Sequence, residues 1–185
     1  MVKTAVNKVI RRLAAQLTRD DLLRAALDEA LVATGMDDGA VYAWDESADA
    51  LVLVALAPTD EDEEPAASVG SSEEYRVLKP GAGAMMEAVA HRRPIVVDDY
   101  QVYPRALPVV ARAGVRAMVT VPMQIDAERI GGLVVMTFDA QHRFGRRDVE
   151  SLDSIATATA GMVMSRERGK MEGALAAMRL LAPSE

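Results

Sequence analysis

Apolar residues recur at helical spacing over residues 4–34, which predicts helical structure near the N-terminus. The run Thr18-Arg-Asp-Asp interrupts this pattern, so we expect two helices, with Thr18 or Asp20 capping the second one. Gly35 follows the last apolar position and is expected to end that helix. The first helix carries a single apolar stripe, formed by Val6, Val9, Ile10, Leu13 and Leu17.

The middle of the chain contains short apolar runs between turn residues, a pattern typical of β-strands. A short helix is expected at residues 83–92, and an acidic, solvated loop at residues 59–72, whose carboxylates have no fixed geometry for a metal. The connection from Asp98 to Gly114 is long enough to suggest a function. The predicted strands span residues 39–45, 51–57, 75–79, 94–97, 115–125 and 130–138, the last two forming a hairpin.

A second helical pattern begins at Arg146 and extends to about Leu181. Helices at both ends of an antiparallel sheet predict an α+β fold. The terminal helices are expected on one face of the sheet, and loops and short helices on the other. The 185 residues suit one domain with flanking helices. We assign residues 1–17 to an N-terminal helix, 18–165 to the domain and 166–185 to a C-terminal helical extension.

Composition excludes several classes of protein. The net charge of −7 argues against nucleic-acid binding, which needs a basic surface. The absence of cysteine excludes thiol nucleophiles, disulfides and thiolate metal sites. No apolar run reaches the length of about 18 residues that a membrane span requires. We therefore expect a cytoplasmic protein that contacts neither nucleic acid nor membrane.

Several stretches, in their order and spacing, resemble the GAF domain family over roughly residues 18–165. Gly114–Met123 (GVRAMVTVPM) and Ile130–Val135 (IGGLVV) resemble two of its strands, one ending in Val-Pro-Leu and one containing Ile-Gly-x-Leu. Gly81–Gly83 and Arg93–Asp99 resemble its glycine turn and a following hydrophobic strand that ends in Asp. Arg143–Leu152 resembles the start of its last helix. The resemblance implies the α+β fold given above and a sensory role.

The chain departs from the ligand signatures of several GAF domains. It lacks the Asn-Lys-Phe-Asp-Glu signature of the cyclic-nucleotide binders, so we expect cyclic nucleotides to bind weakly or not at all. It also lacks the cysteine used by bilin-binding relatives, by methionine-sulfoxide-reducing relatives and by iron-binding nitric-oxide sensors. The cofactor or ligand therefore stays unknown at this point.

The predicted hairpin offers a candidate binding face. With a tight turn at Ala127–Glu128, Thr120 is expected opposite Val135, and Met118 opposite Thr137. A face that mixes polar and apolar side chains is typical of ligand sites, although threonine in a strand also follows from β-propensity alone. This mixed face is formed by Arg116, Met118, Thr120 and Thr137. The opposite, apolar face suits the packing of the terminal helices; it is formed by Ala117, Val119, Val121, Met123, Gly132, Val134 and Met136.

The long connection contributes further candidates. Asp99, Tyr100 and Tyr103 lie in the segment that, by the resemblance, closes over the ligand. A tyrosine there would stack on a ring or hydrogen-bond a carbonyl; alternatively, it anchors the loop and keeps its hydroxyl in water. Trp44, the only tryptophan, could line the same cavity or serve in the core or an interface.

No catalytic residue and no metal site are predicted. Ser71, Ser72 and Ser151 have no histidine near them in the sequence, so a nucleophile–base pair is missing. His91 and His142 are far apart in a chain without cysteine, which makes a poor set of metal ligands. We therefore expect a protein that is not an enzyme.

Two functions remain open. The first is a regulatory module that binds a small molecule or signal and acts on a separate signalling protein, such as a kinase or regulator. The second is a ligand-free dimerisation or interaction adaptor. The apolar stripes of the terminal helices exceed what one sheet face can cover, which predicts a homodimer.

Overall fold

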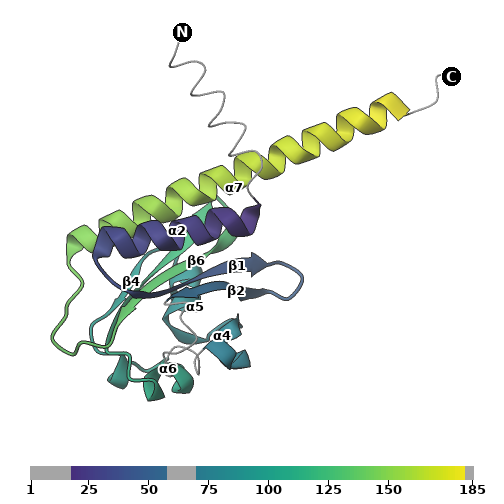
Figure 1. Cartoon of the computed structure of the whole chain (residues 1–185). Coiled ribbons are helices and arrows are strands. Elements are labelled where there is room, and N and C mark those ends of the chain that lie inside the picture. The colour runs from purple at the N-terminus through teal and green to yellow at the C-terminus, as the bar shows by residue number, and fades with distance from the viewer. Residues whose placement is uncertain (1–17, 58–69, 182–185) are drawn as a thin grey trace, which may run out of the picture.

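The computed structural model describes residues 18–57 and 70–181, the stretch 173–181 as helix backbone only. The predicted helix at 4–17 and most of the acidic loop lie outside these residues. A six-stranded antiparallel sheet has the order β3-β2-β1-β6-β5-β4. Helices α2 and α7 cover one face and the short helices the other (Figure 1), which confirms the predicted α+β fold. The strands are β1 (Asp38–Asp45), β2 (Ala50–Ala57), β3 (Val77–Leu78), β4 (Ile95–Val97), β5 (Ala117–Ile125) and β6 (Glu128–Thr137).

Helix α2 (Arg19–Thr34) begins and ends at the predicted signals. Thr18 is its cap: the Thr18 hydroxyl accepts from the backbone N–H of Asp21 at 3.1 Å, and the Asp21 carboxylate accepts from the backbone N–H of Thr18 at 2.6 Å. This reciprocal pair satisfies two N–H groups at the helix start. Gly35 ends the helix in the left-handed conformation, with φ of 66°. One face of α2 is buried against the sheet.

Helix α7 (Arg146–Leu181) is one continuous helix, as expected. Its first half packs on the sheet through Leu152, Ala156, Ala160 and Val163, which are fully buried. At 1.5 Å per residue the helix is about 54 Å long, and its second half continues beyond the sheet (Figure 1). No helix in the described part of the chain is apolar over a stretch long enough to cross a membrane.

The other face carries short elements, two of which differ from the prediction. The strand expected at 75–79 is reduced to β3, because Tyr75 belongs to the helical turn α4 (Glu73–Arg76) and its side chain is buried. The connection expected as a loop contains the 3₁₀ turn η1 (Tyr100–Val102) and helix α6 (Pro108–Arg112). Pro108 occupies the first turn of α6, where its missing N–H costs nothing. Helix α5 (Gly83–His91) lies where it was predicted.

The register of the β5–β6 hairpin also corrects the prediction. The two turn residues are Asp126 and Ala127, not Ala127–Glu128, and Asp126 has a positive φ of 52°. Farther along, Met123 lies opposite Gly131 while Gln124 lies opposite Arg129, so Ile130 is an extra residue on β6. Such a bulge shifts every later pair by one residue.

As a result, the predicted face of β6 is inverted. Thr120 lies opposite Val134 and Met118 opposite Met136, so Val134 and Met136 share the face of the candidate residues. Thr137, assigned to that face from the sequence, lies opposite Ala117 on the side of α2 and α7. The faces of β5 itself were predicted correctly.

The sheet thus separates two hydrophobic cores. The helix-side core lies between the sheet and the two long helices; its buried members are Leu22, Leu23, Ala26, Leu27, Ala30, Val41, Ala117, Val119, Val121, Met123, Ile130, Leu133, Val135, Phe144, Leu152, Ala156, Ala160 and Val163. The cavity-side core lies under the short elements; its buried members are Ala40, Tyr42, Leu51, Tyr75, Leu78, Ala84, Met85, Met86, Ala88, Val89, Ile95, Val97, Tyr100, Leu107, Val110, Val115, Met118, Val134 and Met136.

Candidate functional site

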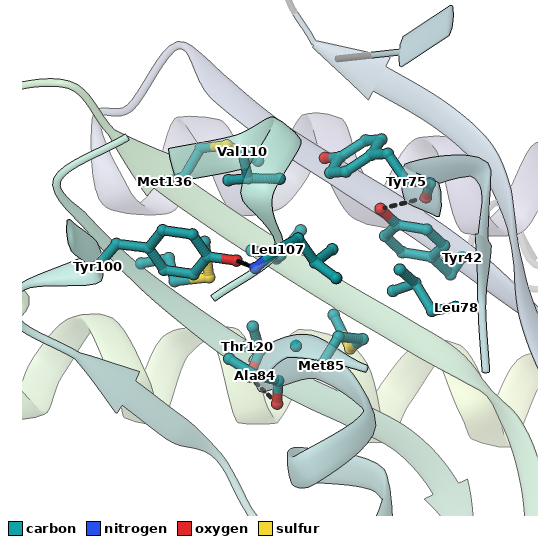
Figure 2. Close-up of a pocket in the computed structure, with 13 residues that line it drawn as sticks. Tyr42, Tyr75, Leu78, Ala84, Met85, Tyr100, Leu107, Val110, Thr120 and Met136 are labelled. Carbon is teal, nitrogen blue, oxygen red and sulfur yellow. Dashed lines mark hydrogen bonds between the residues drawn. The ribbon is translucent and has the colours of Figure 1, made fainter. Parts of the chain in front are cut away.

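A cavity lies inside the cavity-side core, between the sheet and the short elements (Figure 2). Its volume is about 30 Å³, room for about two water molecules. Ligand sites for small organic molecules are at least about ten times larger, so this one is too small for such a molecule as it stands. The described residues that line it are Tyr42, Tyr75, Leu78, Gly83, Ala84, Met85, Tyr100, Leu107, Val110, Met118, Thr120, Val134 and Met136.

Four hydroxyl groups belong to this lining. Thr120 on β5 donates to the carbonyl of Ala84 at 3.2 Å, which fixes the start of α5 against the sheet. Tyr42 on β1 donates to the carbonyl of Tyr75 at 3.2 Å. The hydroxyl of Tyr100 accepts from the backbone N–H of Leu107 at 2.9 Å. Only the buried hydroxyl of Tyr75 has no hydrogen-bond partner within the described chain.

The lining is electrically neutral in the part of the chain that the structure describes, because it contains no Asp, Glu, Lys, Arg or His. Burial raises the pKa values of Tyr42, Tyr75 and Tyr100 above the ordinary 10.0. All three phenols therefore keep their protons at neutral pH. The cavity offers hydroxyl groups, sulfur atoms and hydrocarbon, and no side chain that would balance a charge.

Residues 99–114, here called the covering segment, contribute Tyr100, Leu107 and Val110 to the lining on the side away from the sheet. Asp99 caps η1 by accepting from the N–H of Gln101 at 3.0 Å. The amide of Gln101 in turn donates to the carbonyls of Ala111 at 3.1 Å and Val115 at 2.8 Å, which ties η1 to α6. The segment is therefore an ordered unit with its own hydrogen bonds.

The covering segment is fastened to α5 by a half-buried polar contact. The hydroxyl of Tyr103 donates to the Glu87 carboxylate at 2.5 Å, and the Arg105 guanidinium lies 3.8 Å from the same carboxylate. Burial, and next the bond to Glu87, raise the pKa of Tyr103. The rings of Tyr100 and Tyr103 stack with centroids 5.9 Å apart, so the residue that lines the cavity and the residue that fastens the segment are in contact.

The structure brings together three of the residues predicted for the site. Tyr100, Met118 and Thr120 all line the cavity. Asp99 and Tyr103 lie in the covering segment but outside the lining, where they hold that segment in place.

The remaining three predicted residues lie elsewhere. Arg116 is exposed and joins the fold through its backbone, donating to the carbonyl of Thr137 at 2.8 Å. Thr137 lies on the face of the sheet that packs against α2 and α7, because the bulge at Ile130 shifts the register of β6 by one residue. Trp44 is half-buried near the end of β1, with the Arg129 guanidinium 4.6 Å from its ring centroid. Trp44 therefore lies at a surface and outside this cavity.

Sequence reasoning missed most of the remaining lining. Val134 and Met136 were assigned to the wrong face by the one-residue register error. Tyr42 was recoverable, since it is an aromatic residue in an alternating strand. Tyr75 was not recoverable, because the sequence predicted a strand where the structure has the helical turn α4.

Neither histidine lines the cavity. His91 is exposed at the end of α5, and the ring of His142 packs against Phe144 with centroids 4.7 Å apart. Across the described residues, no three side chains of the His, Asp or Glu type are placed to hold a metal ion together.

The comparison with family models identifies one family. A family model described as GAF domain matches residues 16–164. No curated protein matches the chain. A GAF domain of a phosphoenolpyruvate-protein phosphotransferase from Coxiella burnetii is similar in structure, with a TM-score of 0.66 and 18% identity, over 91% of this chain and 94% of that one.

Two further solved structures extend the likeness. The GAF-B domain of DevS from Mycobacterium smegmatis has a TM-score of 0.64 and 19% identity, over 84% of this chain and 99% of that one. The free methionine-R-sulfoxide reductase from Neisseria meningitidis, solved with its substrate, has a TM-score of 0.62 and 21% identity, over 86% and 87%. At such identities the likeness establishes the fold and not a shared ligand or reaction.

Proposed function

We propose that this chain, which belongs to the GAF domain family, is a sensory module that takes up a small molecule in the cavity under the covering segment. GAF domains are in general sensory and regulatory modules. The observation that carries the proposal is a neutral, hydroxyl-bearing cavity between the sheet and a separately hydrogen-bonded segment. Apolar walls with a few convergent polar groups are the usual anatomy of a ligand site.

Uptake of a ligand requires side chains to move, because about 30 Å³ holds no organic molecule. Three methionines in the lining, Met85, Met118 and Met136, are unbranched and can change rotamer at low cost. Leu107 belongs to the covering segment, so its displacement moves α6 as well. Ligand binding and movement of the covering segment are therefore linked, which is the property that a sensor needs.

We further propose that the module is regulatory and not catalytic. The reductase of similar fold is a likeness of fold alone, and this chain contains no cysteine. Within the described residues, the cavity lining adds no Asp, Glu, Lys, Arg or His.

The signal is proposed to leave through α7 and a second copy of the chain. Helix α7 exposes apolar side chains along its length, with Met162 50% and Met171 62% accessible, and pairing of two chains would cover them. Light scattering is expected to give twice the chain mass of 19.9 kDa. Removal of residues 1–17 and 166–185 together is expected to give a monomer. A monomeric intact protein at micromolar concentration would contradict this part of the proposal.

One observation favours the second function, a ligand-free adaptor. The cavity is nearly filled by its own side chains, as expected of a core that only needs to pack. An adaptor would keep the dimer and need no ligand.

A matched pair of variants on α5 separates the two functions. Ala84 lines the cavity, whereas Ala90 is exposed on the same helix. The protein as purified is examined by native mass spectrometry, and its melting temperature is measured before and after the bound molecule is dialysed away. A sensor is expected to carry or regain a ligand that raises the melting temperature by mass action. Ala84→Met should abolish this gain and Ala90→Met should keep it. A gain that survives Ala84→Met would place the ligand elsewhere and sink the proposal.

A further inference from the structure

The unpaired hydroxyl of Tyr75 indicates what kind of molecule the cavity takes. The side chain is buried and lines the cavity, and its hydroxyl has no partner within the described chain. Figure 2 shows this hydroxyl at the opposite end of the side chain from the carbonyl that Tyr42 contacts. A buried polar group without a partner destabilises the fold, so such a group stands out where each of the other three hydroxyl groups makes a hydrogen bond.

Two of the four hydroxyl groups in the lining have a hydrogen that is not used in a hydrogen bond to a described residue. Tyr42 and Thr120 use their hydroxyl hydrogens on backbone carbonyls. Tyr100 accepts from Leu107 and donates to no described residue. Tyr75 and Tyr100 therefore each have a hydroxyl hydrogen to offer, and the complementary ligand presents a hydrogen-bond acceptor.

Charge narrows the class further. A carboxylate, phosphate or ammonium group in this neutral lining would lose its hydration without gaining a counter-charge, which is far more costly than burying a neutral group. The acceptor must therefore be uncharged, as in a ketone, an aldehyde or a heteroaromatic nitrogen.

The small volume of the cavity and its methionine side chains favour a ligand with a single flat ring. The sulfur-bearing side chains of Met85, Met118 and Met136 surround the cavity with those of tyrosines. Thioethers make favourable contacts with aromatic rings and adapt their shape to them. The unliganded cavity has little free volume, so a compact molecule would displace fewer side chains than a larger one.

We infer that the cavity binds small, uncharged, single-ring aromatic molecules that carry a hydrogen-bond acceptor, with the Tyr75 hydroxyl as its donor. This inference rests on the proposed function and adds the ligand class to it. Tyr75 would act as the residue that distinguishes an acceptor from a hydrocarbon of the same shape.

Three molecules of nearly equal shape test the inference on the full chain. Acetophenone carries a neutral carbonyl, α-methylstyrene replaces that oxygen with a methylene group, and benzoate replaces the methyl group with a charged oxygen. Dissociation constants are measured by titration calorimetry for the native protein, Tyr75→Phe and the control Tyr103→Phe. The control removes the same atom from a tyrosine whose hydroxyl contacts Glu87 outside the lining.

Acetophenone is expected to bind, and benzoate to bind at least about tenfold more weakly. The preference for acetophenone over α-methylstyrene should fall about two- to tenfold in Tyr75→Phe, the value of one buried hydrogen bond. The same preference should be unchanged in Tyr103→Phe. Because the Tyr75 hydroxyl has no partner to lose, Tyr75→Phe should fold with an equal or higher melting temperature.

Three outcomes would overturn the inference: no binding of acetophenone, equal binding of benzoate, or an unchanged preference in Tyr75→Phe. The proposed function is judged separately. If acetophenone and α-methylstyrene bind equally well to the native protein and Ala84→Met abolishes the binding of both, the cavity is a ligand site and only the role of Tyr75 is wrong. If none of the three binds while a different molecule is lost on Ala84→Met, the ligand class is wrong and the sensor stands. If no molecule binds in the cavity, both the inferred ligand class and the proposed sensory function are wrong.

Discussion

The two faces of the sheet are packed with different types of side chain. The helix-side core is aliphatic apart from Phe144 and a single buried methionine, Met123, and packs two long helices on the strands. The cavity-side core contains Tyr42, Tyr75, Tyr100 and four buried methionines, and the fourth tyrosine, Tyr103, packs against it. Branched and small aliphatic side chains fit one arrangement well, whereas methionines and tyrosines accept several. We infer from this difference that the helix-side core contributes most of the stability of the fold, whereas the side chains of the cavity-side core can rearrange.

Truncating one leucine on each face should give the largest contrast. Leu152 is fully buried under α7, so Leu152→Ala is expected to lower the free energy of unfolding by about 3–5 kcal/mol. Leu107 belongs to the covering segment, which can close around the space left, so Leu107→Ala should cost about 2 kcal/mol, the lower end of the range for a buried leucine. Urea denaturation measures both. Equal losses would mean that the cavity side is packed as rigidly as the helix side.

Two neighbouring glycines on β6 sharpen the comparison. A Cβ at Gly131 would lie 2.1 Å from the carbonyl oxygen of Tyr42, so the backbones of β1 and β6 would have to separate. A Cβ at Gly132 would lie 2.3 Å from the Met85 sulfur, which can move away by rotation. Gly131→Ala is expected to cost about 3 kcal/mol and Gly132→Ala about 1 kcal/mol. If thermal or urea unfolding ranks them the other way round, Met85 is fixed and the cavity cannot adapt.

Alkaline pH should act on the cavity side alone, because all four tyrosines of the chain lie there. Burial raises their folded-state pKa values above the ordinary 10.0. The stability that follows is complete below the pKa of the unfolded chain and is lost as the pH rises above it toward the folded-state values. The urea midpoint should stay constant up to about pH 9 and fall above about pH 10. Tyr75→Phe should make that fall shallower; an identical slope would show that Tyr75 is accessible to solvent.

The fold was predictable because its signals are local. Thr18 and Gly35 mark the ends of α2, and the pattern from Arg146 gives α7. The β6 faces were not predictable, because one turn position and the bulge at Ile130 decide them, and a one-residue shift inverts a strand.

The cavity was predictable only in part, since its lining comes from elements distant in the sequence. Tyr100 and Thr120 followed from the covering segment and from β5. Tyr75 belongs to a single helical turn that only tertiary packing stabilises, so its burial beside Tyr42 was not visible in the sequence.

Amide hydrogen exchange of the unliganded protein tests the central claim most directly, since it compares the covering segment with both the sheet and α7 in one measurement. If the cavity side opens to admit a ligand, amides of residues 100–112 should exchange faster than those of 117–123 on β5 and 152–163 on α7. Exchange in the covering segment as slow as in those two stretches would contradict the account, because the cavity would then be a permanently closed part of the core.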